Sequence, residues 1–431
     1  MKQKTVSFYT LGCKVNQYET NAMAQKFANN GYKVVHEKED ADIAIVNTCT
    51  VTNMSDRKSR QILRRIKKVN PKTLVVAVGC YVQVAKEKVE QIPEIDLVLG
   101  NNEKKDIVEY IETYLKENNK LNKVSDVMYQ KQFIDFGTIT YTEKTRAAIK
   151  IQDGCDRFCS YCIIPYARGR VRSRKPESIL EEVNKIVNKG IKEIVITGIH
   201  VASYGKDFKE DYKLIDLLED LNKIENLKRI RLSSIEPMIM TDEFIERLRK
   251  LEKICHHFHL SLQSGCDETL KRMNRRYTTS EFMEVVKRIR TNYKDAMLTT
   301  DVIVGFPGET DAEFETTYNF LKEVKFYKMH VFKYSQREGT KAAVMPNQVD
   351  GNVKESRSQK LIELSNNNQE EYNKEYIGKM VEVLFEEREG NYYKGHTSNY
   401  IMVKYETGES LENCIKTVEV IEAQEDFLIA R

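Results

Sequence analysis

Long apolar runs are absent from this sequence, and their absence argues against a membrane protein. No stretch reaches the roughly 18 apolar residues that a membrane-spanning helix requires. The N-terminal residues MKQKTVSF lack the apolar core of a secretory signal peptide. We therefore expect a cytoplasmic protein with no membrane contact. Because cytoplasmic thiols stay reduced, the 9 cysteines are expected to be ligands or core residues rather than disulfides.

Charge is nearly balanced over the whole chain but is unevenly distributed along it. The 431 residues carry 69 Lys and Arg against 65 Asp and Glu, a net of +4. Residues 373–431 hold 7 basic and 12 acidic side chains, so this segment carries −5 and the rest carries +9. A basic body with an acidic tail favours a polyanionic partner that contacts the body.

The length and the hydrophobic pattern predict three domains. Residues 1–116 alternate short apolar strands with helices, which is typical of an open parallel α/β sheet. Residues 117–140 are largely polar and are interpreted as a linker. Residues 141–371 repeat strand and helix six times and predict a partial (β/α)6 barrel, with its site at the C-terminal ends of the strands. Residues 373–431 carry strand-like runs separated by glycine turns and predict a small β-barrel.

Three closely spaced cysteines follow the first expected barrel strand. Cys155, Cys159 and Cys162 lie in the segment GCDRFCSYC. Three thiolates on one loop can hold three irons of a four-iron, four-sulfur cluster and leave the fourth iron open to a small molecule. A structural zinc site is the alternative, but it requires four closing ligands, and the nearest following histidine is His200.

Three other cysteines, Cys13, Cys49 and Cys80, are distant in sequence but share one position relative to the expected strands. The apolar runs Thr5–Thr10, Ile43–Asn47 and Leu74–Val78 each end just before one of them. The C-terminal ends of parallel strands lie along one edge of a sheet, about 4.8 Å apart between neighbours. The three thiols can therefore converge on a second cluster. The alternative is that each is an ordinary buried thiol.

The CxxxCxxC spacing resembles the signature of the radical S-adenosylmethionine (SAM) enzymes. The two cysteine sets, combined with a small β-barrel tail, resemble the methylthiotransferases of that superfamily, in which the tail is called a TRAM domain. The resemblance covers essentially the whole chain. Three segments look like those of the threonylcarbamoyladenosine tRNA methylthiotransferases: LGCKVNQYET from Leu11, NTCTVT from Asn47 and IIPYARGRVRSR from Ile163.

This resemblance implies methylthiolation of N6-threonylcarbamoyladenosine at position 37 of tRNA. The cluster on Cys155, Cys159 and Cys162 would cleave SAM, and the resulting radical would take hydrogen from adenine C2. An auxiliary cluster on the N-terminal cysteines would supply sulfur methylated by another SAM. Two [4Fe–4S] clusters, two SAM molecules per turnover, and an electron donor such as flavodoxin or ferredoxin are implied. We expect the protein to act as a monomer.

The resemblance also implies where SAM and the substrate bind. The residues expected to contact the substrate follow the CxxxCxxC motif closely and are Arg168, Arg170, Arg172 and Arg174. We hypothesise that one of them pairs bidentately with the threonylcarbamoyl carboxylate. A tight turn between strand and helix is the alternative explanation for Gly305 and Gly308. The expected SAM contacts are Tyr161, Thr197, Gly198, Ser234, Glu236, Gln263, Gly305, Phe306 and Pro307.

Two other functions are compatible with the sequence. One is methylthiolation of a ribosomal-protein aspartate, which keeps the chemistry and changes the substrate class. The other is a non-catalytic RNA-binding protein whose domains are stapled by metal. The acidic tail does not by itself favour RNA, so the expectation that it binds RNA rests mainly on the resemblance.

Overall fold

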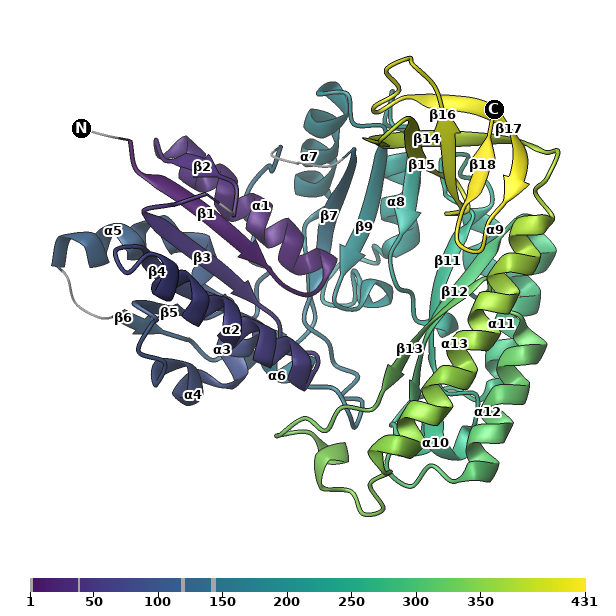
Figure 1. Cartoon of the computed structure of the whole chain (residues 1–431), viewed down its shortest axis with the longest axis horizontal. Helices are drawn as coiled ribbons and strands as arrows, with labels where there is room; N and C mark the ends of the chain where they lie inside the picture. The colour runs from purple at the N-terminus through teal and green to yellow at the C-terminus, as the bar shows by residue number, and fades with distance from the viewer. Residues whose placement is uncertain (1–2, 38, 118–120, 141–144) are drawn as a thin grey trace.

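The computed structural model describes residues 3–37, 39–117, 121–140 and 145–431. An N-terminal α/β domain lies beside a central curved sheet, and a small β-barrel covers the end at which the central strands begin (Figure 1). Among the described residues, no helix is both long enough and apolar enough to cross a membrane.

The N-terminal domain is an open parallel sheet with the strand order β2-β1-β3-β4-β5-β6. Strands β3 and β4 are wholly buried, which explains their continuous Val, Ile and Ala runs. The strands predicted from those runs are confirmed, whereas β2 and β6 are short edge strands with exposed residues and too little apolar pattern to detect. The strands are β1 (Thr5–Thr10), β2 (Lys33–Val35), β3 (Ile43–Thr48), β4 (Leu74–Gly79), β5 (Leu97–Leu99) and β6 (Leu121–Lys123).

Helices cover both faces of this sheet, and two of them begin at cysteines or directly after one. Helix α1 starts directly after Cys13, and α3 starts at Cys80. Thr52 caps α2 by accepting a hydrogen bond from the backbone N–H of Ser55. The helices are α1 (Lys14–Asn29), α2 (Asn53–Val69), α3 (Cys80–Val84), α4 (Lys86–Glu90) and α5 (Ile107–Glu117).

The segment interpreted as a linker, residues 117–140, contributes to the N-terminal sheet. Its residues 121–123 form β6, which pairs with β5 in parallel register. An edge strand needs only backbone hydrogen bonds, so a polar sequence can supply one. Further along, Ile139 is buried against Tyr18 and Ala22. The part of the predicted linker at residues 118–120, and the predicted domain boundary at residue 141, lie outside the described residues.

The central domain is a partial barrel of parallel strands, as predicted. Strands β10, β9 and β7 form one sheet and β11, β12 and β13 another, and isolated bridges from Ile230 to Ile254 and from Ile235 to Leu260 join the two. A short antiparallel strand, β8 (Arg172–Ser173), follows the cysteine loop. The parallel strands are β7 (Arg146–Asp153), β9 (Glu193–Gly198), β10 (Arg229–Leu232), β11 (His257–Gln263), β12 (Met297–Val304) and β13 (Lys328–Lys333).

Helices line the outer face of the partial barrel and enclose its main apolar core. The long helix α13 was not predicted; it packs against β13 and leads into the C-terminal domain (Figure 1). The helices are α6 (Ile164–Arg168), α7 (Pro176–Asn188), α8 (Leu214–Asn222), α9 (Asp242–Leu248), α10 (Asp267–Arg272), α11 (Thr279–Asn292), α12 (Asp311–Val324) and α13 (Gly351–Lys374).

The C-terminal domain is a closed barrel with the strand order β14-β15-β16-β18-β17, which confirms the predicted fold. Alternating residues such as Val383, Phe385 and Val403 fill its interior. Met297 and Tyr327 of the central domain belong to the same apolar cluster, so the barrel is packed onto the central domain. The strands are β14 (Met380–Glu389), β15 (Tyr392–Thr397), β16 (Met402–Glu406), β17 (Ile415–Ala423) and β18 (Leu428–Ala430).

Candidate active site

Three neighbouring strands of the N-terminal sheet carry Cys13, Cys49 and Cys80 at their C-terminal ends. Strand β3 lies between β1 and β4 and pairs with both. Gly12 has φ = +94°, and a Cβ there would lie 2.6 Å from the Cys49 Sγ atom. Only glycine allows this close approach of the first loop to the second thiol. The sheet therefore gathers the three cysteines as the strand pattern predicts.

Polar groups contact the sulfur atoms of this set. Burial raises the pKa of the Cys49 thiol, the backbone N–H of Val51 lowers it, and the nearby Cys80 and Cys13 thiols raise it further. The Arg168 Nε atom lies 3.2 Å from the Cys80 Sγ and donates to it, and Asn101 Nδ2 lies 3.8 Å away. A guanidinium beside a cysteine stabilises the thiolate, which is the metal-binding form.

Arg168 is held by a buried ionic network that joins the two larger domains. Its guanidinium pairs with both carboxylate oxygens of Glu19 on α1, and Glu19 also pairs with Lys104 and Lys150. Burial would raise the pKa of Glu19, but the three cations hold it well below its usual value. Lys150 also contacts Asp153 at 2.6 Å. The network fixes the N-terminal sheet against β7.

The structure places Arg168, Arg172 and Arg174, which are predicted to contact the substrate, inside the protein. Their side chains are 1%, 2% and 0% exposed. Arg174 pairs with Glu182 at 2.5 Å, and Arg172 donates to the Arg168 carbonyl at 2.6 Å. The segment runs between packed domains, so its cations neutralise buried carboxylates. Sequence alone cannot distinguish this role from nucleic-acid contact.

Arg170 differs from its three neighbours because it is exposed. Its side chain is 54% exposed, lies over the Phe158 ring and contacts Asp156 at 3.3 Å. An exposed ion pair of this kind contributes little stability, on the order of 0–1 kcal/mol. Arg170 is therefore the member of this group that remains free to meet a substrate.

The second cysteine set lies on the loop after β7, at the C-terminal end of the barrel strands. Cys155, Cys159 and Cys162 are each half-buried. Burial raises the pKa of Cys155 to about 11 and that of Cys162 to about 12. Arg275 Nη1 lies 3.5 Å from the Cys159 Sγ and donates to it. Three thiols with a cationic donor beside them suit an iron–sulfur cluster.

The zinc alternative gains no support from this geometry. Within the described ranges, no group of three or more His, Cys, Asp or Glu side chains is arranged to hold a single metal ion. This holds for the two cysteine sets themselves, all of whose residues are described: Cys13, Cys49 and Cys80, and also Cys155, Cys159 and Cys162.

Packing of α3 against α6 brings the two cysteine sets to the same part of the molecule. Helix α3 begins at Cys80, and α6 begins two residues after Cys162. Asn101 Nδ2 donates to the Ala167 carbonyl at 2.7 Å and strengthens this contact. A cavity of about 290 Å³ lies at Cys13 and is also lined by Ala148 of β7 and Val195 of β9. Cys13 thus faces a cavity that is also lined by strands of the barrel.

Most residues predicted to contact SAM lie at or just after the ends of strands, and several of them contact other residues of the chain. Phe306 is fully buried and packs edge-on against Tyr161, with ring centroids 6.3 Å apart. The backbone N–H of Gly305 donates to Glu309 Oε1 at 2.8 Å, and the Pro307 carbonyl accepts from Arg272 Nε at 3.2 Å. These contacts hold the turn after β12 in one conformation.

The remaining predicted SAM contacts differ in accessibility. Thr197 is buried, Gly198 is half-buried, and Gln263 has a left-handed φ of +73°. Ser234 is exposed and lines the cavity of about 450 Å³ described below rather than the cysteine loop. Glu236 is both charged and buried.

Glu236 is paired on two sides. It contacts Arg157, which lies on the cysteine loop, and its Oε2 atom lies 3.0 Å from His200 Nε2. Burial alone would raise the pKa of Glu236, but the hydrogen bond from His200 and the charges of His200, Arg157 and Arg275 hold it at about 2. The carboxylate is therefore ionised and orients the loop.

Sequence reasoning missed the residues that contact the cysteines from a distance along the chain. Asn16 Nδ2 donates to the carbonyls of Leu11 and Thr48, at 2.8 and 3.0 Å, and so joins two cysteine-bearing loops. Glu19 lies in the same LGCKVNQYET segment, which is the one signal that could have indicated it. Asn101 and Arg275 belong to no motif, because only folding places them beside sulfur.

Comparison with known families agrees with this arrangement. The radical SAM superfamily matches residues 149–321, and the family described as uncharacterized protein family UPF0004 matches residues 5–100. The radical SAM methyltransferase TsrM of Kitasatospora setae, solved with tryptophan and a SAM analogue, superposes with a TM-score of 0.58 at 14% identity. The alignment covers 77% of this chain and 73% of TsrM. This likeness extends to the fold alone.

Similarity to curated proteins spans nearly the whole chain. The threonylcarbamoyladenosine tRNA methylthiotransferase MtaB of Bacillus subtilis is 44% identical over 97% of this chain and 94% of its own length. MtaB of Aquifex aeolicus is 41% identical over 93% and 96%. A tRNA-2-methylthio-N(6)-dimethylallyladenosine synthase of Thermoanaerobacter sp. (strain X514) is 38% identical over 96% and 90%. The chain therefore belongs to the radical SAM tRNA methylthiotransferase family, and is an enzyme that uses a [4Fe–4S] cluster and SAM.

Proposed function

We propose that the protein converts N6-threonylcarbamoyladenosine to 2-methylthio-N6-threonylcarbamoyladenosine at position 37 of tRNA. The observation that carries the proposal is the pairing of two cysteine sets through α3 and α6, one at the edge of the N-terminal sheet and one on the barrel loop. The names of the Bacillus and Aquifex relatives, which specify threonylcarbamoyladenosine, support this choice of substrate. Family membership sets aside the non-catalytic alternative.

The two cysteine sets are proposed to have different roles. Cys155, Cys159 and Cys162 would hold the cluster that binds SAM, and Cys13, Cys49 and Cys80 would hold an auxiliary cluster. When bound, the clusters supply the electron that cleaves SAM and the sulfur that enters at adenine C2. Two SAM molecules are consumed, one as methyl donor and one as hydrogen acceptor.

Residues of the chain position these groups. Arg168 and Arg275 donate N–H groups to Cys80 and Cys159, which stabilises thiolate ligands and orients their sulfur atoms. We further propose that SAM lies along the strand ends. The proposed contacts are Tyr161, Thr197, Gly198, Ser234, Glu236, Gln263, Gly305, Phe306 and Pro307.

The domain division and the partners are part of the same proposal. Residues 1–116, 141–371 and 373–431 would act as sulfur-donating, radical-generating and RNA-contacting domains, with residues 117–140 between the first two. In the C-terminal domain, Lys394 and Lys404 pair with Glu387 and Glu389, so support for the RNA-contacting role comes from the tRNA-modifying relatives. Flavodoxin or ferredoxin would supply electrons to a monomeric, cytoplasmic enzyme.

Cysteine variants test the proposal after anaerobic reconstitution. The wild-type chain is expected to hold about eight irons, since each cluster contains four. Replacing Cys13, Cys49 and Cys80 with alanine should leave about four irons and preserve 5′-deoxyadenosine formation under dithionite, but abolish the methylthio product. Replacing Cys155, Cys159 and Cys162 should abolish SAM cleavage. Cys414→Ala, outside both sets, is the matched control.

Substrate identity is tested with separate RNAs and a protein. Nucleoside mass spectrometry should detect the methylthio group on threonylcarbamoyladenosine tRNA, and not on dimethylallyladenosine tRNA or on a ribosomal-protein aspartate. The dimethylallyl substrate is included because relatives carrying that name are 38% identical to this chain. Product on either of the other substrates, and none on threonylcarbamoyladenosine, would contradict the assignment.

A further inference from the structure

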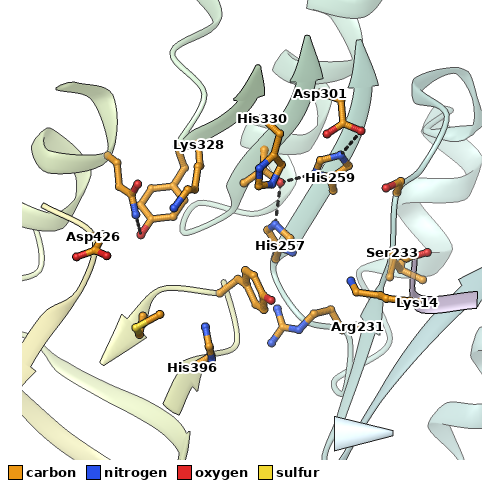
Figure 2. A pocket seen from close by; sticks show the side chains of 17 residues that line it. Lys14, Arg231, Ser233, His257, His259, Asp301, Lys328, His330, His396 and Asp426 are labelled. Carbon is orange, nitrogen blue, oxygen red and sulfur yellow. Dashed lines mark hydrogen bonds and ion pairs between the residues drawn. The ribbon is translucent and has the colours of Figure 1, made fainter. Parts of the chain in front are cut away.

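All three domains contribute to a cavity of about 450 Å³ inside the partial barrel (Figure 2). Lys14 comes from the start of α1, Arg231 from β10, His257 from β11, and Tyr400 from the turn between β15 and β16. Figure 2 shows Lys14 reaching from the N-terminal domain toward Arg231. None of these four residues belongs to the predicted cysteine or SAM sites, although Ser234, an expected SAM contact, also lines the cavity.

Positive charge in this cavity is incompletely paired. Among the described residues, Lys14 and Lys328 form no ion pair, and both side chains line the cavity. Arg231 forms an ion pair with the buried Glu193 at 2.7 Å, which neutralises its charge. Two acidic residues also line the cavity: Asp301 lies 3.4 Å from His259, and Asp426 forms no ion pair among the described residues. The lining holds three basic against two acidic side chains, and it therefore favours an anionic ligand group beside the unpaired Lys14 and Lys328.

A buried histidine in the wall has an unused hydrogen-bonding atom. His257 is 7% exposed, and its Nε2 atom lies 2.9 Å from Thr299 Oγ1. Its Nδ1 atom has no partner among the residues that the structure describes. Burial, followed by the charge of Arg231, holds the pKa of His257 well below its usual value, so the ring is neutral. A buried polar atom without a partner is costly unless a ligand or water completes it.

Tyr400 gives the cavity a rigid aromatic wall. The tyrosine ring stacks between those of His257 and His396, at centroid distances of 4.8 and 4.7 Å, and Arg231 lies 4.8 Å from its centroid. Its φ is +75°, a left-handed conformation that tyrosine rarely adopts. Strained residues of this kind occur preferentially where a ligand is held.

The cavity adjoins the auxiliary cysteines. Lys14 directly follows Cys13, and Lys14, Arg231 and Tyr400 also line the smaller cavity that contains Cys13. A group bound between Lys14 and Arg231 therefore lies next to the proposed point of sulfur delivery. A base whose C2 faces Cys13 can place a substituent on its N6 into the larger cavity.

We propose that this cavity binds the threonylcarbamoyl arm of the substrate, with the positive charge of Lys14 and Lys328 attracting its carboxylate from opposite sides and Tyr400 forming part of the wall. This inference rests on the proposed function and adds the site that selects the substrate. An apolar dimethylallyl arm would leave the cations and His257 Nδ1 without partners, and such unpaired groups reject a ligand strongly. The cavity replaces the buried arginines as the carboxylate partner.

Binding of three RNA hairpins to the reconstituted full chain tests the proposal. The anticodon stem-loops carry adenosine, threonylcarbamoyladenosine, or the methyl ester of the latter, which removes only the negative charge. The wild-type protein should prefer the acid over the other two by about tenfold, as measured by fluorescence anisotropy. Lys14→Met and Lys328→Met should each reduce this preference to about twofold or less, without weakening binding of the adenosine hairpin.

Controls separate this inference from the proposed function. Lys26→Met, on α1 but outside the cavity, should retain the full preference. Because Lys14 adjoins Cys13, iron content and SAM cleavage are measured for each variant, and Lys328 provides a second test distant from any cysteine. Equal weakening of all three hairpins would instead indicate a phosphate contact and overturn the proposal, as would wild-type binding without preference. Absence of methylthio product from wild-type protein would contradict the proposed function itself.

Discussion

Individual side chains near the cysteines illustrate how one residue type serves different purposes. Arg168 and Arg275 donate to sulfur, Arg174 neutralises a buried glutamate, and Arg170 is exposed. A buried guanidinium needs paired carboxylates, because isolated buried charge is very costly. Whether an arginine can also contact a ligand therefore depends on whether a buried carboxylate already occupies its guanidinium.

Arg168→Gln should weaken both the fold and the auxiliary site. Removing one partner of a buried ion pair costs about 3–5 kcal/mol, measured here as the free energy of unfolding in urea. Loss of a residue that orients a metal ligand lowers metal affinity by about 10–100-fold, so chelators should remove auxiliary iron faster. Arg168→Lys is the control for charge without the Nε donor. Unchanged chelator resistance in Arg168→Gln would show that the donor to Cys80 has no effect on the cluster.

Glu236 predicts an acid-dependent loss of stability. Its pKa is about 2 in the folded chain, below the ordinary value of 4.5. Because the folded-state pKa is lower, this contribution is full above about pH 4.5 and is lost as the pH falls toward 2, for a total of about 3 kcal/mol. Urea unfolding at pH 7 and pH 3 should show a smaller pH dependence in Glu236→Gln. Equal pH dependence in both proteins would contradict this.

At the scale of elements, the turn between β1 and α1 is constrained at Gly12. Gly12 and Gly31 both have positive φ, +94° and +80°, so either substitution by alanine strains the backbone. Only at Gly12 would the new Cβ collide with another group, the Cys49 Sγ at 2.6 Å; at Gly31 nothing lies within 4 Å. Comparing the two alanine variants therefore separates the effect of backbone strain from the effect of the collision with Cys49.

Gly12→Ala should displace the cysteine-bearing loops, whereas Gly31→Ala should cost only the strain of about 1–2 kcal/mol. Iron per chain after reconstitution should fall toward four in Gly12→Ala and stay near eight in Gly31→Ala, since four irons belong to each cluster. Equal iron content in the two variants would mean that the close approach at Gly12 is dispensable.

At the scale of the whole molecule, a buried glutamate joins the barrel to the C-terminal domain. Glu193 is fully buried at the start of β9 and contacts Arg231 at 2.7 Å and Arg229 at 3.7 Å. Those arginines donate to the Ser398 and His396 carbonyls, at 2.8 and 2.9 Å. One carboxylate in another domain therefore helps to hold the C-terminal barrel in position, together with the apolar packing around Met297 and Tyr327.

Glu193→Gln should loosen the C-terminal barrel, because it leaves buried guanidinium groups without their counterion. We expect a loss of about 3–5 kcal/mol in unfolding free energy and faster hydrogen exchange in β14 and β15. Glu382→Gln is the control: its side chain is 60% exposed and pairs with Arg229 at 2.9 Å, so it should cost about 1 kcal/mol or less. Similar effects from both variants would argue against the buried anchor.

The fold was largely predictable because its signals are local. Continuous apolar runs specify the buried strands, and the cysteines after β1, β3 and β4 follow from the rule that parallel strands end along one edge. Short edge strands such as β2 and β6 lack such runs. The long helix α13 carries a mixed sequence whose burial depends on β13, so its pattern was not distinctive.

The sequence by itself determined the two cysteine sets and the strand ends that carry them, because motif spacing and hydrophobic period act over a few residues. Only the tertiary structure decided which charges are buried. Arg168 meets Glu19 across 149 residues of chain, and Lys14 and Tyr400 line one cavity from opposite ends of the sequence. Whether a cation faces a carboxylate, a sulfur or a substrate depends on domain packing, and no local pattern records that packing.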